Sequence, residues 1–311
     1  MMLSVRLQCF NHANYLEQAL KSIIAQKTNF PFEVVIGDDF SKDNSIEVIE
    51  RTIKGHTNPN ITFCLLKREV GDLYSIYREK NGRLENFVDI IHHCQGKYIA
   101  LLDGDDYWTD PLKLQKQVDF LEQNNNFSGV ASNSLVKYEG STKEHLFRKK
   151  LKSELQTNDL LESRHFHTAT FLFRKTAFRN DFPKKVLSAD RTLFLLVSCF
   201  GSIKLLDDVT AVYRKNDGGI SRQVTSKQMK LDYNIAKYIK TYNTDFNIYR
   251  LKSFISKTVL EYSFKIYFVD FIKASIYITY FNIKERRGVK GKTKSLKQSL
   301  KLIKKNYIKI G

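Results

Sequence analysis

The sequence predicts an α/β protein whose sheet is mostly parallel, followed by a helical C-terminal extension. The first observation is that apolar runs of strand length alternate with stretches that carry apolar residues at helical spacing. The strand-like runs cover 3–10, 32–37, 61–67 and 98–102, and the helical stretches cover 15–26, 43–54 and 83–93. Strands that alternate with helices form a parallel sheet covered on both faces. The second observation is that the pattern becomes helical throughout from about residue 225.

The remaining elements of the sheet region are expected before about residue 221. They are helices at 112–123 and 188–199 and strands near 129–136, 169–174, 202–206 and 209–213. We interpret 70–81 and 136–165 as loops that shape a substrate pocket. The sequence therefore predicts a sheet-containing domain at 1–223 and a helical, basic extension at 224–311.

Composition indicates a folded protein in a reducing compartment. Hydrophobic residues make up 42% of the 311 residues and aromatic residues 13%, with only four prolines, so the chain has apolar surface to bury. Four cysteines are scattered without close pairs, at Cys9, Cys64, Cys94 and Cys199. The N-terminal residues enter a strand without the long apolar region of a signal peptide. We therefore expect a cytoplasmic protein.

Positive charge is concentrated at the C-terminal end. The formal net charge is +18, and in residues 284–311 eleven Lys and Arg are opposed only by Glu285. Such an excess favours a polyanion as partner, whether nucleic acid, anionic lipid or a phosphorylated substrate.

The stretch 264–283, just before this basic end, is dense in apolar residues. Lys265, Asp270 and Lys273 interrupt it, so it is too broken to cross a bilayer, which requires roughly 20 apolar residues. At about 100° per residue the three charges share one sector of a helix, so we expect an amphipathic helix. Together with the basic end, it predicts peripheral docking on the inner face of an anionic membrane. The alternative is an ordinary solvated helical tail.

An acidic turn follows the fourth strand-like run. Asp103, Gly104, Asp105 and Asp106 stand where a parallel sheet binds ligands, at the carboxyl end of a strand. Carboxylates gathered there repel one another unless a cation or hydrogen-bond donors relieve them. A Mg²⁺ or Mn²⁺ ion that also holds a nucleotide diphosphate would do so. The alternative is a solvated acidic turn, whereas a calcium loop is disfavoured because Trp108 replaces its glycine.

A second acidic pair, Asp38 and Asp39, ends the second strand-like run and points to the same crevice. A carboxylate there can accept hydrogen bonds from a nucleobase imide or a ribose hydroxyl. An ordinary turn that caps the next helix is the alternative.

In order along the chain, these motifs resemble those of family 2 glycosyltransferases with the GT-A fold, a Rossmann-like sheet that binds nucleotide-diphosphate sugars. The resemblance covers about 3–221. It rests on the opening strand with its Asn-containing turn, on Val35 to Asp43, on Gly96 to Asp106 and on a closing Tyr213-Arg214 segment. Asn216 departs from the family's pattern, because many members have histidine there. The Gly218-Gly219 pair suggests a loop that closes over the donor.

The resemblance assigns roles to the acidic residues and their neighbours. It implies that a nucleotide sugar is bound by Gln8, Phe10, Asn11, Asp38, Asp39, Asp103, Gly104 and Asp105. The divalent cation would be held by Asp105 or Asp106, with Asp103 also facing the metal and phosphate. The choice between Asp105 and Asp106 stays open.

For catalysis, Asp190 resembles the general base of the inverting members. An Asp in the first turn of a helix is also favoured by the helix dipole alone. His167, Arg191 and Arg214 are candidates for acceptor or phosphate contacts.

The sequence thus predicts an inverting, metal-dependent hexosyl- or N-acetylhexosaminyl-transferase. The resemblance favours a UDP-sugar as donor and a lipid-linked glycan of a bacterial surface polysaccharide, such as O-antigen, capsule or lipopolysaccharide, as acceptor. One rival is a non-catalytic GT-A-like domain that binds carbohydrate or acts as a scaffold. Another is a nucleic-acid-binding protein, which explains the basic end but not the acidic clusters, so we expect no nucleic acid as partner.

Overall fold

The computed structural model describes residues 1–216, 224–263, 265–285 and 300–301. Two compact units are present in it. Unit 1 comprises Met1–Gln156, Arg164–Lys184 and the described residues of 196–217, and unit 2 comprises Thr157–Ser163, Lys185–Leu195 and the described residues of 218–311. The Gly218-Gly219 pair and most of the basic C-terminal end lie outside the described residues.

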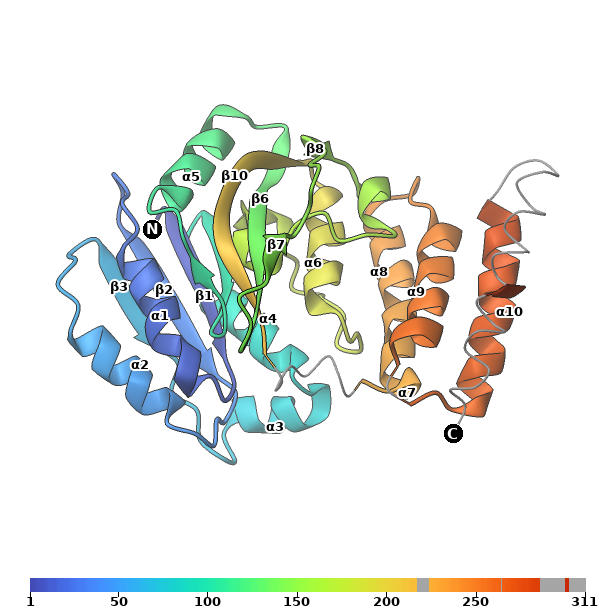
Figure 1. Cartoon of the computed structure of the whole chain (residues 1–311), viewed down its shortest axis with the longest axis horizontal. Helices are drawn as coiled ribbons and strands as arrows, with labels where there is room; N and C mark the ends of the chain where they lie inside the picture. The colour runs from blue at the N-terminus through green and yellow to red at the C-terminus, as the bar shows by residue number, and fades with distance from the viewer. Residues whose placement is uncertain (217–223, 264, 286–299, 302–311) are drawn as a thin grey trace. The chain divides into compact units, whose positions relative to one another are not determined.

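Unit 1 is built on one mixed sheet, which in the described residues has ten strands (Figure 1). Its order is β3-β2-β1-β4-β9-β6-β10-β5, with β7 paired to β6 and β8 to β10. The strands are β1 Leu3–Cys9, β2 Phe32–Asp38, β3 Ile61–Leu65, β4 Tyr98–Asp103, β5 Tyr107–Trp108, β6 Phe127–Tyr138, β7 Glu144–Leu146, β8 Glu154–Leu155, β9 Leu172–Arg174 and β10 Ser202–Lys215. The first four strands pair in parallel, and β9 joins them antiparallel to β4 and β6.

Helices cover this sheet, as the alternating sequence pattern predicts. They are α1 Ala13–Ile24, α2 Ser45–Lys54, α3 Leu73–Asn81, α4 Leu84–His93 and α5 Lys113–Gln123. A further helix, α6 Ala189–Ser198, begins in unit 2 and ends in unit 1. All seven residues of β2 are buried, which requires packing on both of its faces. One close approach needs a glycine, because a Cβ on Gly37 would lie 2.5 Å from Ile90 and 2.6 Å from Asn86 of α4. The mostly parallel α/β prediction is confirmed.

Three sequence expectations differ from the structure. Residues 73–81, expected as a loop, form α3, which Asp72 begins by accepting a hydrogen bond from Ser75 N at 2.6 Å. The expected loop at 136–165 contains β7 and β8. The two strands expected at 202–206 and 209–213 form the single strand β10, whose register with β6 shifts between Leu205 and Ala211. A shift of this kind breaks the apolar alternation and makes one strand resemble two.

Lys113, on α5, is an uncommon feature of the core of unit 1. Its side chain is fully buried, with Nζ 2.7 Å from Gln117 Oε1 and 4.5 Å from the centre of the Trp108 ring. Burial lowers the pKa of Lys113 from 10.5 to about 7, and Asp110 opposes that shift. The ammonium group is therefore held in surroundings that favour its neutral form.

In unit 2 the described residues after 224 are helical, as expected. The helices are α7 Ser226–Met229, α8 Tyr233–Tyr242, α9 Ile248–Tyr262 and α10 Phe268–Glu285, with a 3₁₀ turn at Lys230–Asp232. No helix in the described part of the chain has the length and apolarity needed to cross a membrane. The boundary between 223 and 224 stays a prediction.

The three charges expected to share one sector of a helix do not all do so. Lys265 precedes α10, and Asp270 is 5% exposed and bonded to Ser226 Oγ at 2.9 Å and to Lys230 Nζ at 2.8 Å. Ser226 and Lys230 lie at the start of the helical part of unit 2. The side of α10 that carries Asp270 therefore packs within unit 2. The residues on its other side are consequently left to face solvent.

Candidate active site

The loops after β1 and β2 are held together at the carboxyl edge of the sheet. Asn11 donates its N–H to Ser41 Oγ at 2.7 Å and accepts the Lys42 N–H on Oδ1 at 2.7 Å. Both loops contain a non-glycine residue in the left-handed region, with φ of 55° at Asn11 and 59° at Phe40. Such a backbone is costly for a bulky residue and is found where surrounding contacts impose it. Phe10 lies beside Asn11 and is partly buried.

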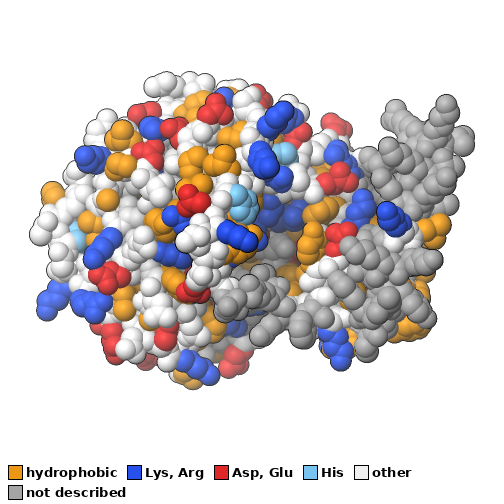
Figure 2. Space-filling view, in the orientation of Figure 1, with side chains coloured by type: hydrophobic (Ala, Val, Ile, Leu, Met, Phe, Trp, Pro, Cys, Tyr) orange, Lys and Arg blue, Asp and Glu red, His pale blue; other side chains and the backbone are white. Residues whose placement is uncertain are grey.

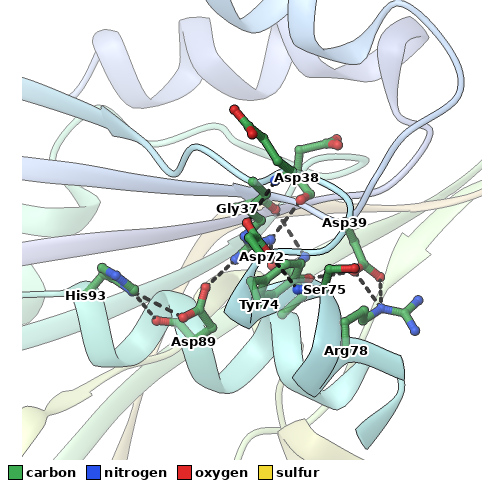
Figure 3. Close-up of polar contacts among 12 residues, drawn as sticks. Gly37, Asp38, Asp39, Asp72, Tyr74, Ser75, Arg78, Asp89 and His93 are labelled. Atoms are coloured by element: carbon green, nitrogen blue, oxygen red, sulfur yellow. Dashed lines mark hydrogen bonds and ion pairs between the residues drawn. The ribbon is translucent and has the colours of Figure 1, made fainter. Parts of the chain in front are cut away.

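The two acids that end β2 have different surroundings. The carboxylate of Asp38 accepts the N–H of Ser41 at 2.8 Å and the Ser41 hydroxyl, so it closes its own turn. Asp39 is 3% exposed and accepts Arg78 Nε at 2.6 and 2.9 Å and the Tyr74 hydroxyl at 2.6 Å. Both partners of Asp39 are on α3, and their side chains point toward it in Figure 3.

Arg78 balances the charge of Asp39, and Tyr74 adds a neutral hydrogen bond to it. The hydrogen bond from Arg78 to Asp39 raises the pKa of Arg78. Burial raises the pKa of Tyr74, and the hydrogen bond from Tyr74 to Asp39 raises it further. Arg68 lies over the Tyr74 ring at 3.6 Å and binds Asp89 at 2.7 Å. The β2 end therefore offers a carboxylate whose hydrogen-bond partners a ligand would have to rearrange.

Gln8 and Asp103 are brought together by the register of β1 and β4, where they are directly paired. Arg6, on the same strand as Gln8, donates to Asp103 Oδ1 at 3.0 Å and to Gln8 Oε1. Arg6 is 1% exposed, and its guanidinium lies 4.5 Å from the centre of the Phe87 ring. Arg6 thus fixes the side chains of Gln8 and Asp103, both of which are predicted to bind the nucleotide. A basic residue inside an apolar strand is the sequence signal that could have identified this role.

Gly104 turns the chain sharply after β4. Its N–H binds Gln8 O at 2.8 Å, and the N–H of Asp106 binds Asp103 O at 3.0 Å. A Cβ on Gly104 would lie 2.9 Å from His12 Nδ1 and 3.0 Å from Leu16. The close approach of α1 therefore requires glycine here and places the start of α1 against the acidic turn.

Asp105 meets three polar groups from distant parts of the sequence. Its Oδ2 lies 3.9 Å from His12 Nε2 and 3.4 Å from Asn216 Nδ2, and its carbonyl accepts Arg214 Nη1 at 2.7 Å. Burial raises the pKa of Asp105, His12 lowers it and Asp103 raises it. Within the described residues, His12 Nδ1 is buried without a hydrogen-bond partner.

Asp106 is the most enclosed of the three carboxylates. It is 2% exposed, its Oδ1 accepts the backbone N–H of Arg214 at 2.9 Å, and its Oδ2 lies 3.6 Å from His167 Nδ1. The His167 ring stacks on Tyr213 with centres 4.0 Å apart. Burial raises the pKa of Asp106 well above its ordinary value, and Asp105 and Asp103 raise it further. Negative charge in this turn is therefore under-compensated.

A divalent cation fits this donor set on chemical grounds. Within the described residues no group of three His, Cys, Asp or Glu side chains is arranged to enclose a metal. Mg²⁺ does not need such a cage, because it commonly takes one or two carboxylates and completes its shell with water and phosphate oxygens. The raised pKa values of Asp105 and Asp106 indicate carboxylates that a cation would stabilise in their charged form.

Asp190 and Arg191 belong to unit 2, in the first turn of α6. The segment that leads into them is fixed by Asp232, which accepts Leu187 N at 2.8 Å, Ser188 N at 2.9 Å and Ser188 Oγ at 2.6 Å. The guanidinium of Arg191 lies 4.5 Å from the centre of the Phe254 ring. The C-terminal helices therefore hold the start of α6.

Sequence reasoning identified one group of these residues and missed another. In unit 1 the structure gathers Gln8, Asp103, Gly104, Asp105, Asp106, His167 and Arg214 around the end of β4. The sequence reasoning missed four residues that hold the predicted ones in place, namely Arg6, Tyr74, Arg78 and Asp232. The roles assigned to individual residues stay predictions.

Comparison with known proteins identifies the sequence family. The model of "Glycosyl transferase family 2" matches residues 4–182, which is more than half of the chain. An uncharacterized protein of Mycobacterium tuberculosis (strain ATCC 25618 / H37Rv) is 32% identical over 213 residues, covering 68% of this chain. The matched region spans 58% of that relative's length.

Solved structures share the fold. A crystal structure of residues 1–349 of Staphylococcus aureus TarS, in complex with UDP-GlcNAc, superposes with a TM-score of 0.65 at 17% identity and covers 99% of this chain and 89% of that one. The mannosyltransferase PcManGT from Pyrobaculum calidifontis, in complex with GDP-Man and Mn²⁺, gives a TM-score of 0.54 at 12% identity and covers 97% and 84%. These likenesses confirm the predicted GT-A fold, and the family match shows that the chain belongs to glycosyl transferase family 2.

Proposed function

We propose that the chain transfers a sugar, with inversion, from a nucleotide-diphosphate sugar to an acceptor hydroxyl. The observation that carries this proposal is the gathering of Asp103, Asp105 and Asp106 at the carboxyl end of β4, where burial and mutual repulsion raise the pKa values of Asp105 and Asp106. A site of this kind favours a ligand that arrives with compensating positive charge. A nucleotide diphosphate bound with Mg²⁺ or Mn²⁺ has this property.

For the donor we propose a UDP-sugar, of the hexosyl or N-acetylhexosaminyl class. Support comes from TarS, the fold relative whose complex contains UDP-GlcNAc. At the β2 end, Asp39 would accept hydrogen bonds from the uracil imide or the ribose, while Gln8 near the end of β1 and Phe10 and Asn11 in the loop after it would complete the donor site. Asp38 contributes by holding the turn that carries Asp39.

Asp105 is the residue we propose to hold the metal, with Asp103 or Asp106 beside it. The Asn216 amide, 3.4 Å from Asp105, could present its oxygen in place of its nitrogen, since the two ends of an amide are assigned from their hydrogen bonds. When bound, the cation supplies positive charge that stabilises the departing diphosphate. Support for a metal comes from the Mn²⁺ complex of the mannosyltransferase relative.

The transfer would require a base on the acceptor side. We assign Asp190 to take the proton of the acceptor hydroxyl as its oxygen forms a bond to the anomeric carbon. The bond between that carbon and the phosphate oxygen breaks on the opposite side, and the diphosphate leaves with the electron pair. Arg214, whose guanidinium lies beside Asp105 and over the Tyr107 ring at 4.5 Å, could add positive charge for that oxygen. His167 and Arg191 remain candidates for contacts to the acceptor or phosphate.

The acceptor we propose is a lipid-linked glycan of a bacterial surface polysaccharide, with the enzyme working at the cytoplasmic face of the membrane. The basic composition of 284–311 supports this location. TarS of S. aureus, which is named a poly(ribitol-phosphate) beta-N-acetylglucosaminyltransferase, is also 25% identical to this chain over 223 residues.

The test is donor turnover by Asp190→Asn, measured as UDP release from a panel of UDP-sugars with Mg²⁺ or Mn²⁺. Loss of the base should lower turnover by about 10²-fold or more. The dissociation constant of UDP, measured by calorimetry, should stay within about threefold, because the donor is proposed to bind to unit 1 residues. Asp245→Asn, an exposed acid on the same unit, is the matched control.

Two outcomes would contradict the proposal. Unchanged turnover in Asp190→Asn removes the base assignment. Wild-type protein that binds nucleotide sugars or glycans without releasing UDP, under any metal condition, would instead establish the non-catalytic GT-A domain.

A further inference from the structure

The outward side of α10 is largely apolar, with Thr279, whose hydroxyl donates to Ser275 O at 3.0 Å, as the polar residue in the same sector. Six side chains on it are between 37% and 60% exposed: Phe268, Val269, Ile272, Ile276, Tyr280 and Ile283. At about 100° per residue, these positions fall within a sector of about 120°. We call this set the α10 ridge. Figure 2 shows hydrophobic side chains at the surface of the C-terminal part of the chain, close to Lys and Arg.

The opposite side of α10 already accounts for its packing within unit 2. Phe271, Ala274, Ile278 and Phe281 are at most 6% exposed, and Asp270 is anchored to Ser226 and Lys230. A helix that only had to cover α9 would carry polar residues on its outer side. The α10 ridge is therefore apolar surface that the described packing does not require, and surfaces of this kind mark interaction sites.

The charges around the ridge select the partner. The three lysines of 265–284 are exposed, at Lys265, Lys273 and Lys284, and the one acid in that range, Asp270, is buried. The sequence that follows adds further Lys and Arg up to residue 309. An apolar stripe bordered by cations suits a surface that is apolar inside and anionic at its boundary.

We propose that the α10 ridge lies flat in the headgroup region of an anionic lipid bilayer. Its isoleucine and phenylalanine side chains would enter the acyl boundary, while Tyr280 and the flanking lysines meet the headgroups. A contact with a second copy of the chain is disfavoured, because two ridges would bring like charges together at Lys273 and Lys284. Spanning is not required, since no described helix is long and apolar enough to cross a membrane.

The inference rests on the proposed function only in its purpose, which is to bring the enzyme to a lipid-linked acceptor. Vesicle binding by the full chain can be measured without donor or acceptor. Failure of the ridge to bind lipid therefore leaves UDP release untouched, and failure of turnover leaves vesicle binding untouched.

The experiment is flotation of the full chain with vesicles of phosphatidylcholine alone, and with vesicles of phosphatidylcholine and phosphatidylglycerol. The ridge variant is Ile272→Ser with Ile276→Ser. The matched control is Val70→Ser with Leu73→Ser, because both residues are exposed apolar side chains of unit 1, at 89% and 72%. We expect the wild type and the control to bind the anionic vesicles, and the ridge variant to bind about tenfold less.

The electrostatic part is tested by Lys273→Gln with Lys284→Gln. Each neutralised lysine should lower binding to anionic vesicles about fivefold, and raising the salt concentration should remove the difference from wild type. Equal binding of the ridge variant and the wild type would overturn the proposal. The proposal would also be overturned if the wild type did not bind vesicles but formed a dimer, and if the ridge variant were a monomer.

Discussion

The two acidic strand ends of unit 1 have similar sequences and opposite electrostatics. At the end of β2, Asp39 receives two hydrogen bonds from Arg78 and one from Tyr74, and Asp38 is bonded by Ser41. At the end of β4, Asp106 is buried with one backbone N–H and a neighbouring His167. Asp39 at the β2 end is therefore paired with an arginine, whereas at the β4 end Arg6 pairs with Asp103 and burial raises the pKa of Asp105 and Asp106.

Under the proposed function, this contrast would suit the two unlike parts of a nucleotide-diphosphate sugar. A balanced carboxylate exchanges its hydrogen-bond partners for those of a neutral ligand such as a base or ribose. An under-compensated carboxylate cluster attracts a cation, and through it a phosphate. A separate buried ionisable group, Lys113 on α5, lies next to Trp108 of β5, the strand that follows this turn. The variants below test the two sides of the comparison and this buried group.

The largest effect is expected for Asp105→Asn. It removes the carboxylate proposed to hold the metal, so UDP release should fall about 10²–10³-fold, because charge on the leaving group loses its stabilisation. Turnover should also lose its dependence on Mn²⁺ concentration. Asp207→Asn, an exposed acid on β10, is the control and should keep wild-type activity. Retained metal dependence in Asp105→Asn would transfer the metal to Asp106 or Asp103.

The second variant is Asp39→Asn at the balanced end. Loss of a charged acceptor should weaken UDP binding by about 10–100-fold in calorimetry, because hydrogen bonds to charged groups contribute roughly 1.5–3 kcal/mol. The loss should be the same with and without Mn²⁺, unlike that of Asp105→Asn. A metal-dependent loss would show that the two ends do not act separately.

Lys113→Met tests the buried group beside Trp108. The pKa of Lys113 is about 7 in the folded protein, below its ordinary value of 10.5, so the native state binds fewer protons than the unfolded state between those values. Wild-type stability should therefore rise as pH increases through this window. The variant should gain about 1–3 kcal/mol at about pH 6, and the gain should shrink by about pH 10.

Urea unfolding at the two pH values gives this measurement. Lys116→Met is a suitable control, since Lys116 on the same helix is paired with Asp110 at 2.8 Å and with Asp208 at 2.9 Å. A stability gain in Lys113→Met that does not change with pH would show that Lys113 is not a buried charge.

The smallest expected effect is a change in stability that has opposite signs for substitutions at the two strand ends. Asp106→Asn keeps an oxygen for the Arg214 N–H and removes a buried charge, so metal-free protein should become more stable by about 1 kcal/mol at neutral pH. Asp38→Asn removes a carboxylate whose hydrogen bonds are satisfied, so it should be destabilised by about 1 kcal/mol. Thermal unfolding without metal measures both, and equal signs would contradict the comparison.

Sequence periodicity predicted the parallel half of the sheet well, because β1, β2 and β4 are buried on both faces and read as apolar runs. Periodicity missed α3 because the apolar residues of this helix are exposed. Leu73, Ile76 and Tyr77 are 46% to 72% exposed, so the helix has no apolar face directed at a core. Its sequence signal is the cap at Asp72, which is weak alone.

For the site, the rule that ligands bind at strand ends placed the pair Asp38-Asp39 and the turn 103–106 at the same edge of the sheet before any coordinates. The partners of these acids could not be placed in that way. Arg214 reaches Asp106 through its backbone N–H, a group that every residue except proline has, so no residue type signals the contact. Arg78 lies on the helix that the sequence pattern missed, and its pairing with Asp39 was hidden with it.

The contact between Arg214 and Asp106 also bears on when the site can form during synthesis. It joins residues 108 positions apart, and it depends on β10, the last strand of the sheet among the residues that the structure describes. Until β10 pairs with β6, the carboxylates of the 103–106 turn remain hydrated and separate. Pairings this distant close slowly, because the entropy of the intervening chain must be lost first. The edge of the sheet that carries this turn should therefore be the last part to lose its contact with water.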